Sequence, residues 1–255
     1  MTNEHGGWQV EGDLRRGIGG KYVLHPVTRE RIWVARAYRD GVVIYVGGEW
    51  KISPTAKLYN GSVIVDSTIH HLAKIGGDGI GAAVVINSEV NQGATISSLA
   101  VVVNSEVGWY ARVGTCSRLI DSTLPFDSTL TDGTSMTGAK LNIPGVEIPE
   151  GVLIDTPNGM GYMQLQVCTH SLLVGVLAQT PAGLWLLTLG CWSGTLREFE
   201  NMIASDSWVS TKGARATRAY RPKMKALIAD MKQFIEGQEA DPVHADAETQ
   251  SAAKA

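Results

Sequence analysis

A repeat of seventeen residues between about residues 50 and 154 constrains this chain more than any other feature of its sequence. Residues 87–90 (NSEV), 104–107 (NSEV) and 121–124 (DSTL) each begin seventeen positions after the preceding block. A fixed period of this length is typical of a solenoid. Aliphatic residues recur every five or six positions, apart from one longer gap after Ile75: Ile52, Leu58, Ile64, Ile69, Ile75, Val85, Val90, Ile96, Val102, Val107, Val113, Leu119, Leu124, Leu130, Met136 and Leu141.

A second track of small residues runs two positions before nearly every aliphatic one, as at Ala56, Ala94, Ser105 and Ser122. An aliphatic side chain inside a narrow prism, with a small residue near each sharp corner, explains both tracks. Three such segments close one triangular coil. The sequence therefore predicts a mainly β fold, a left-handed parallel β-helix of about six 17-residue coils over residues 49–157. A β-sandwich would need strict period-two alternation, which is absent.

Residues 1–48 are predicted to form a polar tail and a β cap. The β-rich runs 21–24 and 31–37 flank a proline-containing stretch and predict a hairpin, and residues 42–46 predict a further short strand. A solenoid needs such a cap because its first coil otherwise exposes unpaired backbone groups.

Residues 158–237 are predicted to form a small α+β domain, joined to the β-helix through a Pro- and Gly-containing linker. Thr195 and Glu198 have the spacing of a capping box that opens a helix, and a second amphipathic helix is expected around residues 220–235. The polar, Ala-rich residues 238–255 predict a disordered tail. Three strand-like runs precede the helices: residues 162–167, 172–178 and 184–189.

Bulk properties argue against several classes of function. A formal net charge of −3 and a pI near 6.1 do not favour nucleic acid as a partner. No early apolar segment predicts secretion and no apolar run predicts a membrane span. Three cysteines without zinc spacing fit a reducing compartment, so we expect a cytoplasmic protein.

Two local patterns fall short of a cofactor or metal site. The glycine-rich residues 76–81 lack the Lys-Ser/Thr of a phosphate loop and predict only a corner excursion. Cys168, His170 and Cys191 lack a fourth ligand and a standard zinc spacing. The sequence predicts no cofactor and no metal.

Three short strings carry a resemblance to a protein family: residues 35–37 (ARA), 47–50 (GGEW) and 190–199 (GCWSGTLREF). The repeat itself is similar to that of hexapeptide-repeat proteins. The whole layout resembles left-handed β-helix proteins encoded by bacteriophages and prophages. This resemblance implies a phage origin and a homotrimer, but no settled activity, because fold-level analogy is a weak guide to function.

The repeat register predicts which residues point outward at one corner of the prism. It places His71, Gln92, Trp109 and Phe126 in one column, with Tyr110 beside it. Two neighbouring exposed aromatic residues on a rigid scaffold predict an interface or a ligand-stacking surface. Cations are expected nearby: Lys74 and Arg112 in another column, with Arg118 beyond. Between subunits, such a ridge could hold an anionic, ring-containing ligand, or it could form a trimer interface without ligand.

His70 and His71 support an enzymatic hypothesis. Hexapeptide-repeat acyltransferases use a histidine general base at a subunit interface to activate the acceptor hydroxyl or amine. Residues 76–80 would then be the protruding loop, and acyl-CoA would lie along the coils. No carboxylate that orients either histidine is evident from the sequence.

Three functions are therefore expected to compete. The leading hypothesis is a non-enzymatic, homotrimeric binding protein of phage type, which sequesters a small anionic, nucleotide-like signal or blocks a host defence protein. The first alternative is an acyl-CoA-dependent acyltransferase that uses His70 or His71. The second alternative is a structural component of the virion or of its assembly.

Overall fold

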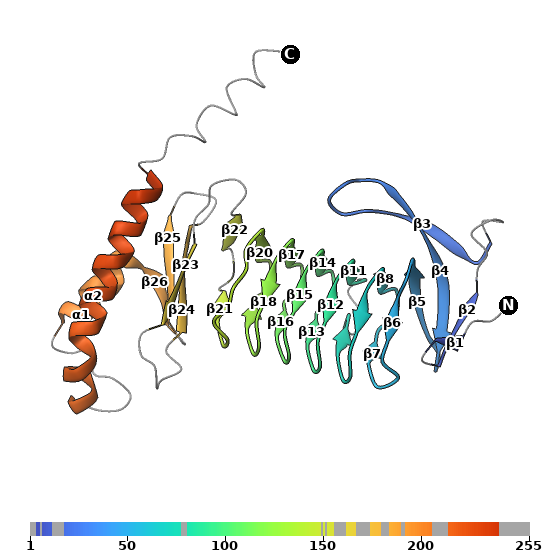
Figure 1. Ribbon diagram of the computed structural model, residues 1–255, viewed down its shortest axis with the longest axis horizontal. Coiled ribbons are helices and arrows are strands. Elements are labelled where there is room, and N and C mark those ends of the chain that lie inside the picture. Colours follow the sequence, from blue (N-terminus) through green and yellow to red (C-terminus); the bar gives the residue numbers. More distant parts are fainter. Residues whose placement is uncertain are drawn as a thin grey trace, which may run out of the picture. The chain divides into compact units, whose positions relative to one another are not determined.

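The computed structural model describes two compact units, Met1–Gly151 and Val152–Ala255 (Figure 1). None of the described helices is long and apolar enough to cross a membrane. The residues that the structure describes are 4–5, 7–11, 18–77, 81–148, 150, 152–155, 162–166, 174–179, 184–189, 192–205 and 214–239.

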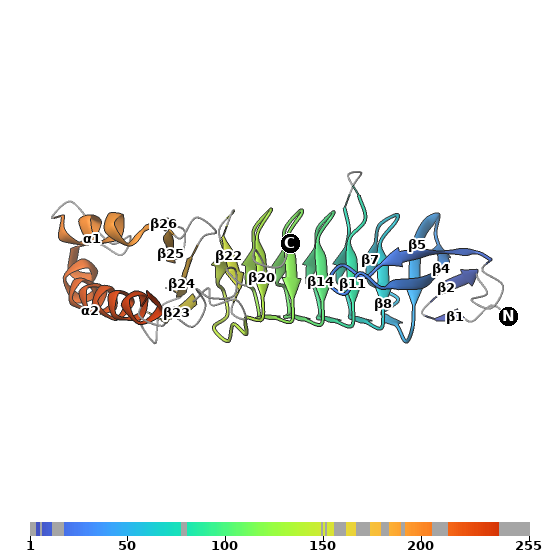
Figure 2. The ribbon, with the colours of Figure 1, turned by 90° about the horizontal axis from the view of Figure 1, so that it is seen from above.

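The first unit is a solenoid with three faces, and each face is a parallel β-sheet. Figure 2 shows its successive coils of short strands. Face 1 contains β5 (Val42–Gly47), β8 (Val63–Val65), β11 (Val84–Ile86), β14 (Val101–Val103), β17 (Arg118–Ile120) and β20 (Ser135–Thr137). Face 2 contains β6 (Lys51–Ile52), β9 (Thr68–Ile69), β12 (Glu89–Val90), β15 (Glu106–Val107) and β18 (Thr123–Leu124). Face 3 contains β7 (Lys57–Leu58), β10 (Lys74–Ile75), β13 (Thr95–Ile96), β16 (Arg112–Val113), β19 (Thr129–Leu130) and β21 (Glu147–Ile148).

The predicted fold class is confirmed: the protein is mainly β, with a left-handed parallel β-helix of about six coils and a small α+β region after it. Equivalent positions pair in register from coil to coil, as Val102 with Leu119 does on face 1. The predicted aliphatic track fills the prism, where its members on coils two to six are at most 2% exposed. Burying each of these side chains stabilises the fold by about 1.5–3 kcal/mol.

The small residues have a role at one corner that the sequence did not predict. Ser105 lies at the corner between faces 1 and 2, and its Oγ donates to Val103 O at 2.6 Å and accepts from Ser122 N at 3.1 Å. Ser88 and Ser122 make the same pair of bonds in the coils before and after. The position requires a hydroxyl as well as a small side chain, because the ladder satisfies buried backbone groups.

The cap extends face 1 by antiparallel strands. β4 (Arg31–Arg39) pairs with β5, and its other edge pairs with β2 (Trp8–Glu11) and β3 (Gly20–Leu24); β1 (Glu4–His5) pairs with β2. Arg39 donates to Pro54 O and Ala56 O, so it satisfies backbone carbonyls at a corner of the first coil. The Arg39 guanidinium lies 4.5 Å from the ring centroid of the buried Trp8. The predicted β cap is therefore present.

The hairpin β3–β4 bends back over the outer side of face 1 (Figure 1). Val23 and Ile32 pack there against a buried apolar cluster of Val34, Val63, Val65, Ile86, Val103 and Ile120. This cluster lies outside the prism and explains why most outward positions on face 1 are valine or isoleucine. The Lys21 ammonium lies 3.7 Å from the centroid of the Tyr45 ring at the same interface.

Two stretches interrupt the period. β8 and β11 are twenty-one residues apart rather than seventeen, because of the excursion predicted at residues 76–81, of which residues 78–80 lie outside the described residues. The sixth coil lacks a strand on face 2, where Lys140 forms an isolated bridge to Thr123. Thr129 on β19 pairs with Glu147 on β21, so the spacing there is eighteen residues rather than seventeen.

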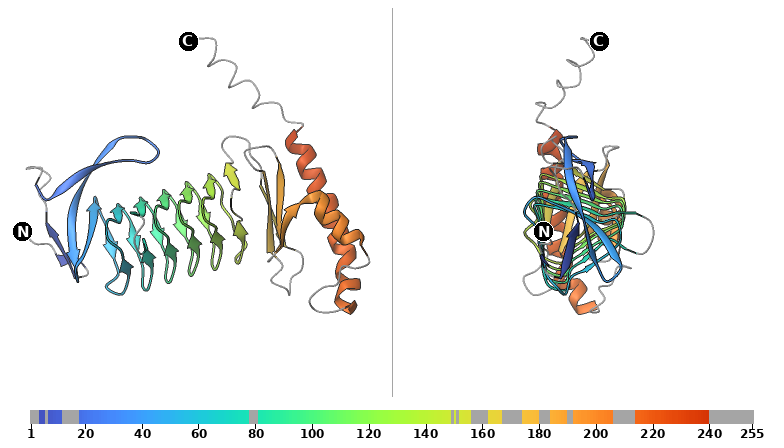
Figure 3. Two further views of the ribbon diagram at one scale, coloured as in Figure 1. Left: turned by 180° about the vertical axis from the view of Figure 1, so that it is seen from behind. Right: turned by 90° about the vertical axis from the view of Figure 1, so that its right-hand side faces the viewer.

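The second unit contains a four-stranded antiparallel sheet with two helices on one side (Figure 3). Phe199, Met224, Ile228 and Met231 from the helices pack against Leu187 and neighbouring residues of the sheet. The sheet consists of β23 (Tyr162–Gln166), β24 (Val174–Gln179), β25 (Trp185–Leu189) and β26 (Trp192–Thr195). The other elements of the second unit are β22 (Leu153–Asp155), α1 (Leu196–Ala204) and α2 (Ala214–Glu239).

The predicted capping box opens α1. Glu198 N donates to Thr195 Oγ1, while Thr195 N donates to the Glu198 carboxylate at 2.7 Å. These hydrogen bonds from Thr195 favour the ionised carboxylate and lower the pKa of Glu198. α2 extends to Glu239, so the first two residues of the predicted tail are helical; the rest of residues 238–255 lies outside the described residues, as do Cys168, His170 and Cys191.

Candidate functional site

The corner between faces 2 and 3 carries a row of exposed apolar side chains, here called the aromatic corner: Leu72, Trp109, Tyr110 and Phe126. Their exposed fractions lie between 47% and 54%. Ile69, Val90, Val107 and Leu124 pair in sequence on the adjoining face 2. The corner residues that follow them therefore stack, in agreement with the predicted column of His71, Gln92, Trp109 and Phe126.

Neighbouring coils hold the aromatic rings in place. The Tyr110 and Phe126 rings meet edge to face, with centroids 6.1 Å apart. The Tyr110 ring also covers Gly93 of the preceding coil, where a Cβ atom would lie 2.5 Å from the ring. Tyr110 N donates to Gln92 O, and Asp127 N donates to Trp109 O. The corner is therefore a formed apolar surface rather than a set of separate side chains.

Tyr110 and Leu72 both have a φ of 58°. Asparagine and aspartate adopt this left-handed conformation more readily than other residues with a side chain, and bulky residues adopt it at a cost. Leu99, at the corner between faces 3 and 1, is also exposed and has a φ of 60°, so this conformation is not peculiar to the aromatic corner.

The predicted cations separate into two places. Lys74 and Arg112 both point outward from face 3, with Thr95 between them in the same column. They belong to the face that adjoins the aromatic corner. Arg118 is on β17 of face 1, so it lies beyond the next corner and does not share their face.

The two histidines have different partners. The Nε2 atom of His70 lies 2.8 Å from Glu89 Oε1, and the two side chains are 41% and 54% exposed. The Nδ1 atom of His71 lies 2.6 Å from the Thr55 hydroxyl. The structure thus supplies a carboxylate partner for His70 that sequence reasoning missed.

The spacing of the repeat explains why the His70–Glu89 pair was missed. One coil later, Asn91 and Glu106 make the equivalent contact at 3.3 Å across fifteen positions. His70 and Glu89 are nineteen positions apart because the excursion after Ile75 adds four residues. The equivalent positions of Asn91 and Glu106 could have pointed to the His70–Glu89 pair, had the four additional residues of the excursion been taken into account.

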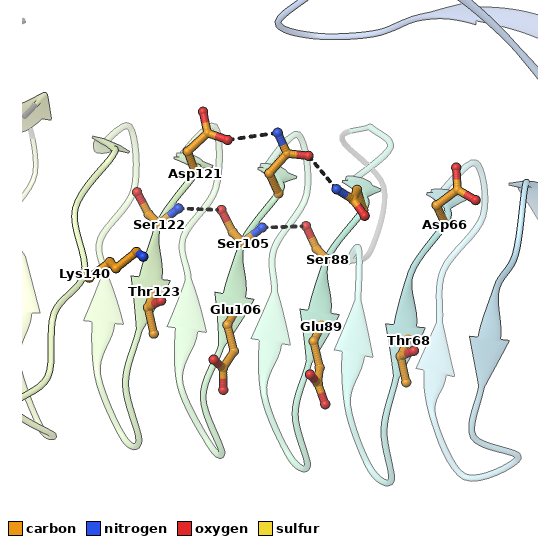
Figure 4. A pocket seen from close by; sticks show the side chains of 12 residues that line it. Asp66, Thr68, Ser88, Glu89, Ser105, Glu106, Asp121, Ser122, Thr123 and Lys140 are labelled. Carbon is orange, nitrogen blue, oxygen red and sulfur yellow. Dashed lines mark hydrogen bonds between the residues drawn. The ribbon is translucent and has the colours of Figure 1, made fainter. Parts of the chain in front are cut away.

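A polar groove of about 390 Å³ runs along the corner between faces 1 and 2 (Figure 4). Asn87 donates to Asn104, and Asn104 donates to Asp121, so that these side chains form a ladder along one wall. The groove is lined by four carboxylates, those of Asp66, Glu89, Glu106 and Asp121, and by one cation, Lys140. Its lining residues are Asp66, Thr68, Asn87, Ser88, Glu89, Asn104, Ser105, Glu106, Asp121, Ser122, Thr123 and Lys140.

Glu89 joins the groove to the histidine, since it lines the groove and also contacts His70 Nε2. The site therefore consists of a histidine–carboxylate pair on face 2, between an acidic groove at one edge of that face and the aromatic corner at the other. Among the described residues, no cluster of three or more His, Cys, Asp or Glu side chains could hold a metal ion.

Comparison with known proteins gives the following matches. No protein-family model and no curated protein matches the sequence. Among solved structures, the chain is similar to the acetyltransferase domain of PglB from Neisseria gonorrhoeae in complex with acetyl coenzyme A, at 18% identity and a TM-score of 0.21 over 43% of this chain and 53% of that one. It is also similar to a mutant perosamine N-acetyltransferase from Caulobacter crescentus in complex with CoA and GDP-perosamine, at 19% identity and a TM-score of 0.23 over 46% and 55%.

These matches cover about half the length of the solved chains. At such low identity and TM-score they carry no conclusion about activity. The function of this chain has to be argued from its own side chains.

Proposed function

We propose that the protein is an acyl-CoA-dependent acyltransferase in which His70 is the general base and Glu89 orients it. The observation that carries this proposal is the 2.8 Å contact between His70 Nε2 and Glu89 Oε1 on the open face of the solenoid. When a carboxylate accepts a hydrogen bond from one ring nitrogen of a neutral histidine, the other ring nitrogen carries a free lone pair. No described residue hydrogen-bonds to His70 Nδ1, and the His70 side chain is 41% exposed, so an acceptor could meet that nitrogen.

The reaction would be a simple acyl exchange. The acceptor hydroxyl or amine attacks the thioester carbonyl, its proton passes to His70 Nδ1, and the C–S bond breaks as the new C–O or C–N bond forms. The proton then leaves with the CoA thiolate as the thiol. Glu89 stabilises the imidazolium that forms transiently, in the same way as other carboxylates paired with a catalytic histidine.

Residues beside the histidine suit the CoA molecule. The aromatic corner presents exposed ring faces of the kind on which an adenine ring stacks. Lys74 and Arg112 on the adjoining face would then meet its phosphate groups. Recognition of the nucleotide and placement of the base would thus come from neighbouring columns of one rigid scaffold.

The test is thiol release from acetyl-CoA in the presence of a panel of amine and hydroxyl acceptors. We expect His70→Ala to lower the rate by about 10²–10⁴-fold, the usual contribution of a general base. Glu89→Gln should cause a smaller loss. Glu106→Gln is the matched control, because Glu106 occupies the same column one coil later and contacts Asn91 instead of a histidine.

Two results would overturn the proposal. One is absence of CoA binding by the native protein. The other is turnover that persists in His70→Ala at the native rate. If instead His71→Ala abolishes turnover while His70→Ala does not, the base is misassigned and Glu89 has no part in catalysis.

The aromatic corner favours a second candidate, a non-enzymatic homotrimer of phage type that sequesters a ring-containing anion such as a nucleotide. Its basis is the row of exposed rings next to Lys74 and Arg112. Calorimetry with linear and cyclic nucleotides tests it: we expect binding that Trp109→Ala abolishes and Leu99→Ala leaves intact. Leu99 is an exposed apolar residue on another corner. Binding of a nucleotide without any thiol release would favour this candidate over acyl transfer.

A further inference from the structure

Among the described residues, the outer edge of β3 (Gly20–Leu24) is an open strand edge. β4 pairs with β3 along one side, and no other described strand pairs with β3 (Figure 1). The edge belongs to the part of the hairpin beside the first coils, where the Lys21 ammonium lies over the Tyr45 ring. A strand at the edge of a sheet presents unpaired N–H and C=O groups that can pair with another chain.

The register of the hairpin determines which backbone groups of β3 face outward. His25 N donates to Glu30 O, and Arg36 N donates to Gly19 O, so both pairs are hydrogen-bonded pairs of the ladder. Such pairs alternate with non-hydrogen-bonded pairs along antiparallel strands. The backbone groups that point away from β4 are therefore those of alternate residues: Gly20, Tyr22 and Leu24.

The sequence of β3 does not protect this edge. Proteins commonly guard an open edge with a proline, a charged side chain or a β-bulge. Lys21 is the one charged residue of β3, and it lies on the inner side, over Tyr45. β3 and β4 pair over five consecutive positions without a bulge, and Pro26 lies beyond the end of the strand. The edge therefore keeps a form to which a further strand can add.

The side chains on the outer face of β3 form an apolar platform beside the edge. Tyr22 and Leu24 alternate with Val23, which packs against the cluster over face 1, so they point the opposite way and are 61% and 54% exposed. The Tyr22 and Trp33 rings meet edge to face, with centroids 5.2 Å apart. The Trp33 ring also covers Gly20, where a Cβ atom would lie 2.7 Å from the ring. Apolar side chains at alternate positions of an added strand would therefore meet these rings.

The cations at the end of the hairpin indicate the charge of a partner. Arg31 lies opposite Leu24, and Arg29 lies in the tip; both are exposed. No described side chain pairs with either guanidinium. Glu30, between them, accepts from the Thr28 hydroxyl at 3.2 Å. A carboxylate near the Leu24 end of an added strand would complement these two cations.

We propose that β3 is a docking edge for an extended segment of a partner protein, which adds to the hairpin as a further strand. The backbone of this segment bonds to the three outward residues of β3. Its alternate apolar side chains meet the Trp33 and Tyr22 rings, and an acidic residue meets Arg31. Main-chain hydrogen bonds supply the affinity of such an addition, and the alternate side chains supply its specificity. The inference does not depend on acyl transfer.

Amide hydrogen exchange, followed residue by residue by NMR, tests the edge in the native chain. In the free protein we expect the amides of Tyr22 and Leu24 to exchange at least about tenfold faster than those of Lys21 and Val23, which bond to β4. Slow exchange of Tyr22 and Leu24 in the free chain overturns the proposal. If the protection rises with protein concentration, a second copy covers the edge; if it does not, residues of the same chain cover it.

Synthetic peptides test the addition itself. The probes are eight-residue peptides in which isoleucine or valine alternates with threonine and both ends carry glutamate, and binding is followed by fluorescence anisotropy. We expect binding to slow the exchange of the Tyr22 and Leu24 amides. N-methylation of one alternate set of peptide amides should abolish binding, whereas N-methylation of the other set should leave it intact, because only one set faces β3. Equal effects of the two sets, or no binding by any of the peptides, would overturn the proposal.

Variants of the hairpin separate the backbone from the side chains. Tyr22→Pro removes an outward N–H without touching the ladder to β4, a place where an edge strand tolerates proline. We expect it to fold, as judged by circular dichroism, and to bind the peptides at least about tenfold more weakly. Tyr22→Ala is the matched control, because it loses the ring but keeps the N–H, and its loss should be smaller. Native affinity in a folded Tyr22→Pro contradicts strand addition.

Arg31→Gln tests the charge of the partner. It should weaken binding of the glutamate-ended peptides by about tenfold, since a hydrogen bond to a charged group is lost. Peptides that end in glutamine should bind this variant and the native chain equally. A native affinity of Arg31→Gln for the glutamate-ended peptides would overturn the acidic character of the partner.

Discussion

Two corners of the same solenoid turn through the same left-handed backbone conformation but carry different kinds of side chain. The corner between faces 1 and 2 turns through Asp66, Asn87, Asn104 and Asp121, whose φ angles lie between 46° and 50°. The aromatic corner turns through Leu72, Gly93, Tyr110 and Asp127, with φ between 53° and 69°. Asparagine and aspartate adopt this conformation readily, whereas leucine and tyrosine do so at a cost.

The difference extends to the side chains. At the first corner, Asn104 both accepts from Asn87 and donates to Asp121, and the serine ladder beneath satisfies the backbone. At the aromatic corner, the small interior residues are mostly alanines, such as Ala94 and Ala111, and the outward residues are apolar and exposed. The first corner is arranged for stability. The second exposes a row of aromatic rings, which indicates a contact surface.

The largest effect is expected from Ser105→Ala at the first corner. Its hydroxyl is buried and accepts from Ser122 N at 3.1 Å, so its removal leaves a buried N–H without its partner. The cost of such a group is about 1–3 kcal/mol. Urea unfolding of the native chain and the variant measures this loss. Ser135→Ala, on the outer side of β20, is the control and should change stability by less than about 0.5 kcal/mol.

A smaller loss is expected from Asn104→Leu. The substitution removes two exposed side-chain hydrogen bonds and places a branched residue at a φ of 49°. We expect the free energy of unfolding to fall by about 1–2 kcal/mol, mainly through the backbone conformation. Urea unfolding of the native chain and the variant measures this change. An unchanged stability would mean that the first corner is no better adapted to its conformation than the aromatic corner.

The fold could be predicted from the sequence because a period of seventeen fixes the register of every coil at once. The columns of Trp109 with Phe126 and of Lys74 with Arg112 follow from that register alone. The capping box at Thr195 and Glu198 could be predicted because both partners are local. In each case the relevant contact is set by spacing along the chain.

Contacts that cross the repeat could not be predicted in the same way. Arg118 was expected beyond the column of Lys74 and Arg112, and the structure places it one corner further along the chain, on face 1. The His70–Glu89 pair was hidden by four additional residues between the two coils. The fold-back of the hairpin onto face 1 depends on the bend of β4, for which the repeat contains no information. Its one sequence signal was the run of valines and isoleucines at outward positions of face 1.

The smallest effect is expected from Tyr110→Asn, which gives the aromatic corner the residue type of the first corner. Relief of the left-handed strain, about 1 kcal/mol, should offset the loss of the edge-to-face contact with Phe126, about 0.5–1.5 kcal/mol. We therefore expect the free energy of unfolding, measured in urea, to change by less than about 0.5 kcal/mol. A loss of more than about 1 kcal/mol would mean that the Tyr110 ring stabilises the fold of its own chain, and that the two corners differ less in function than their side chains suggest.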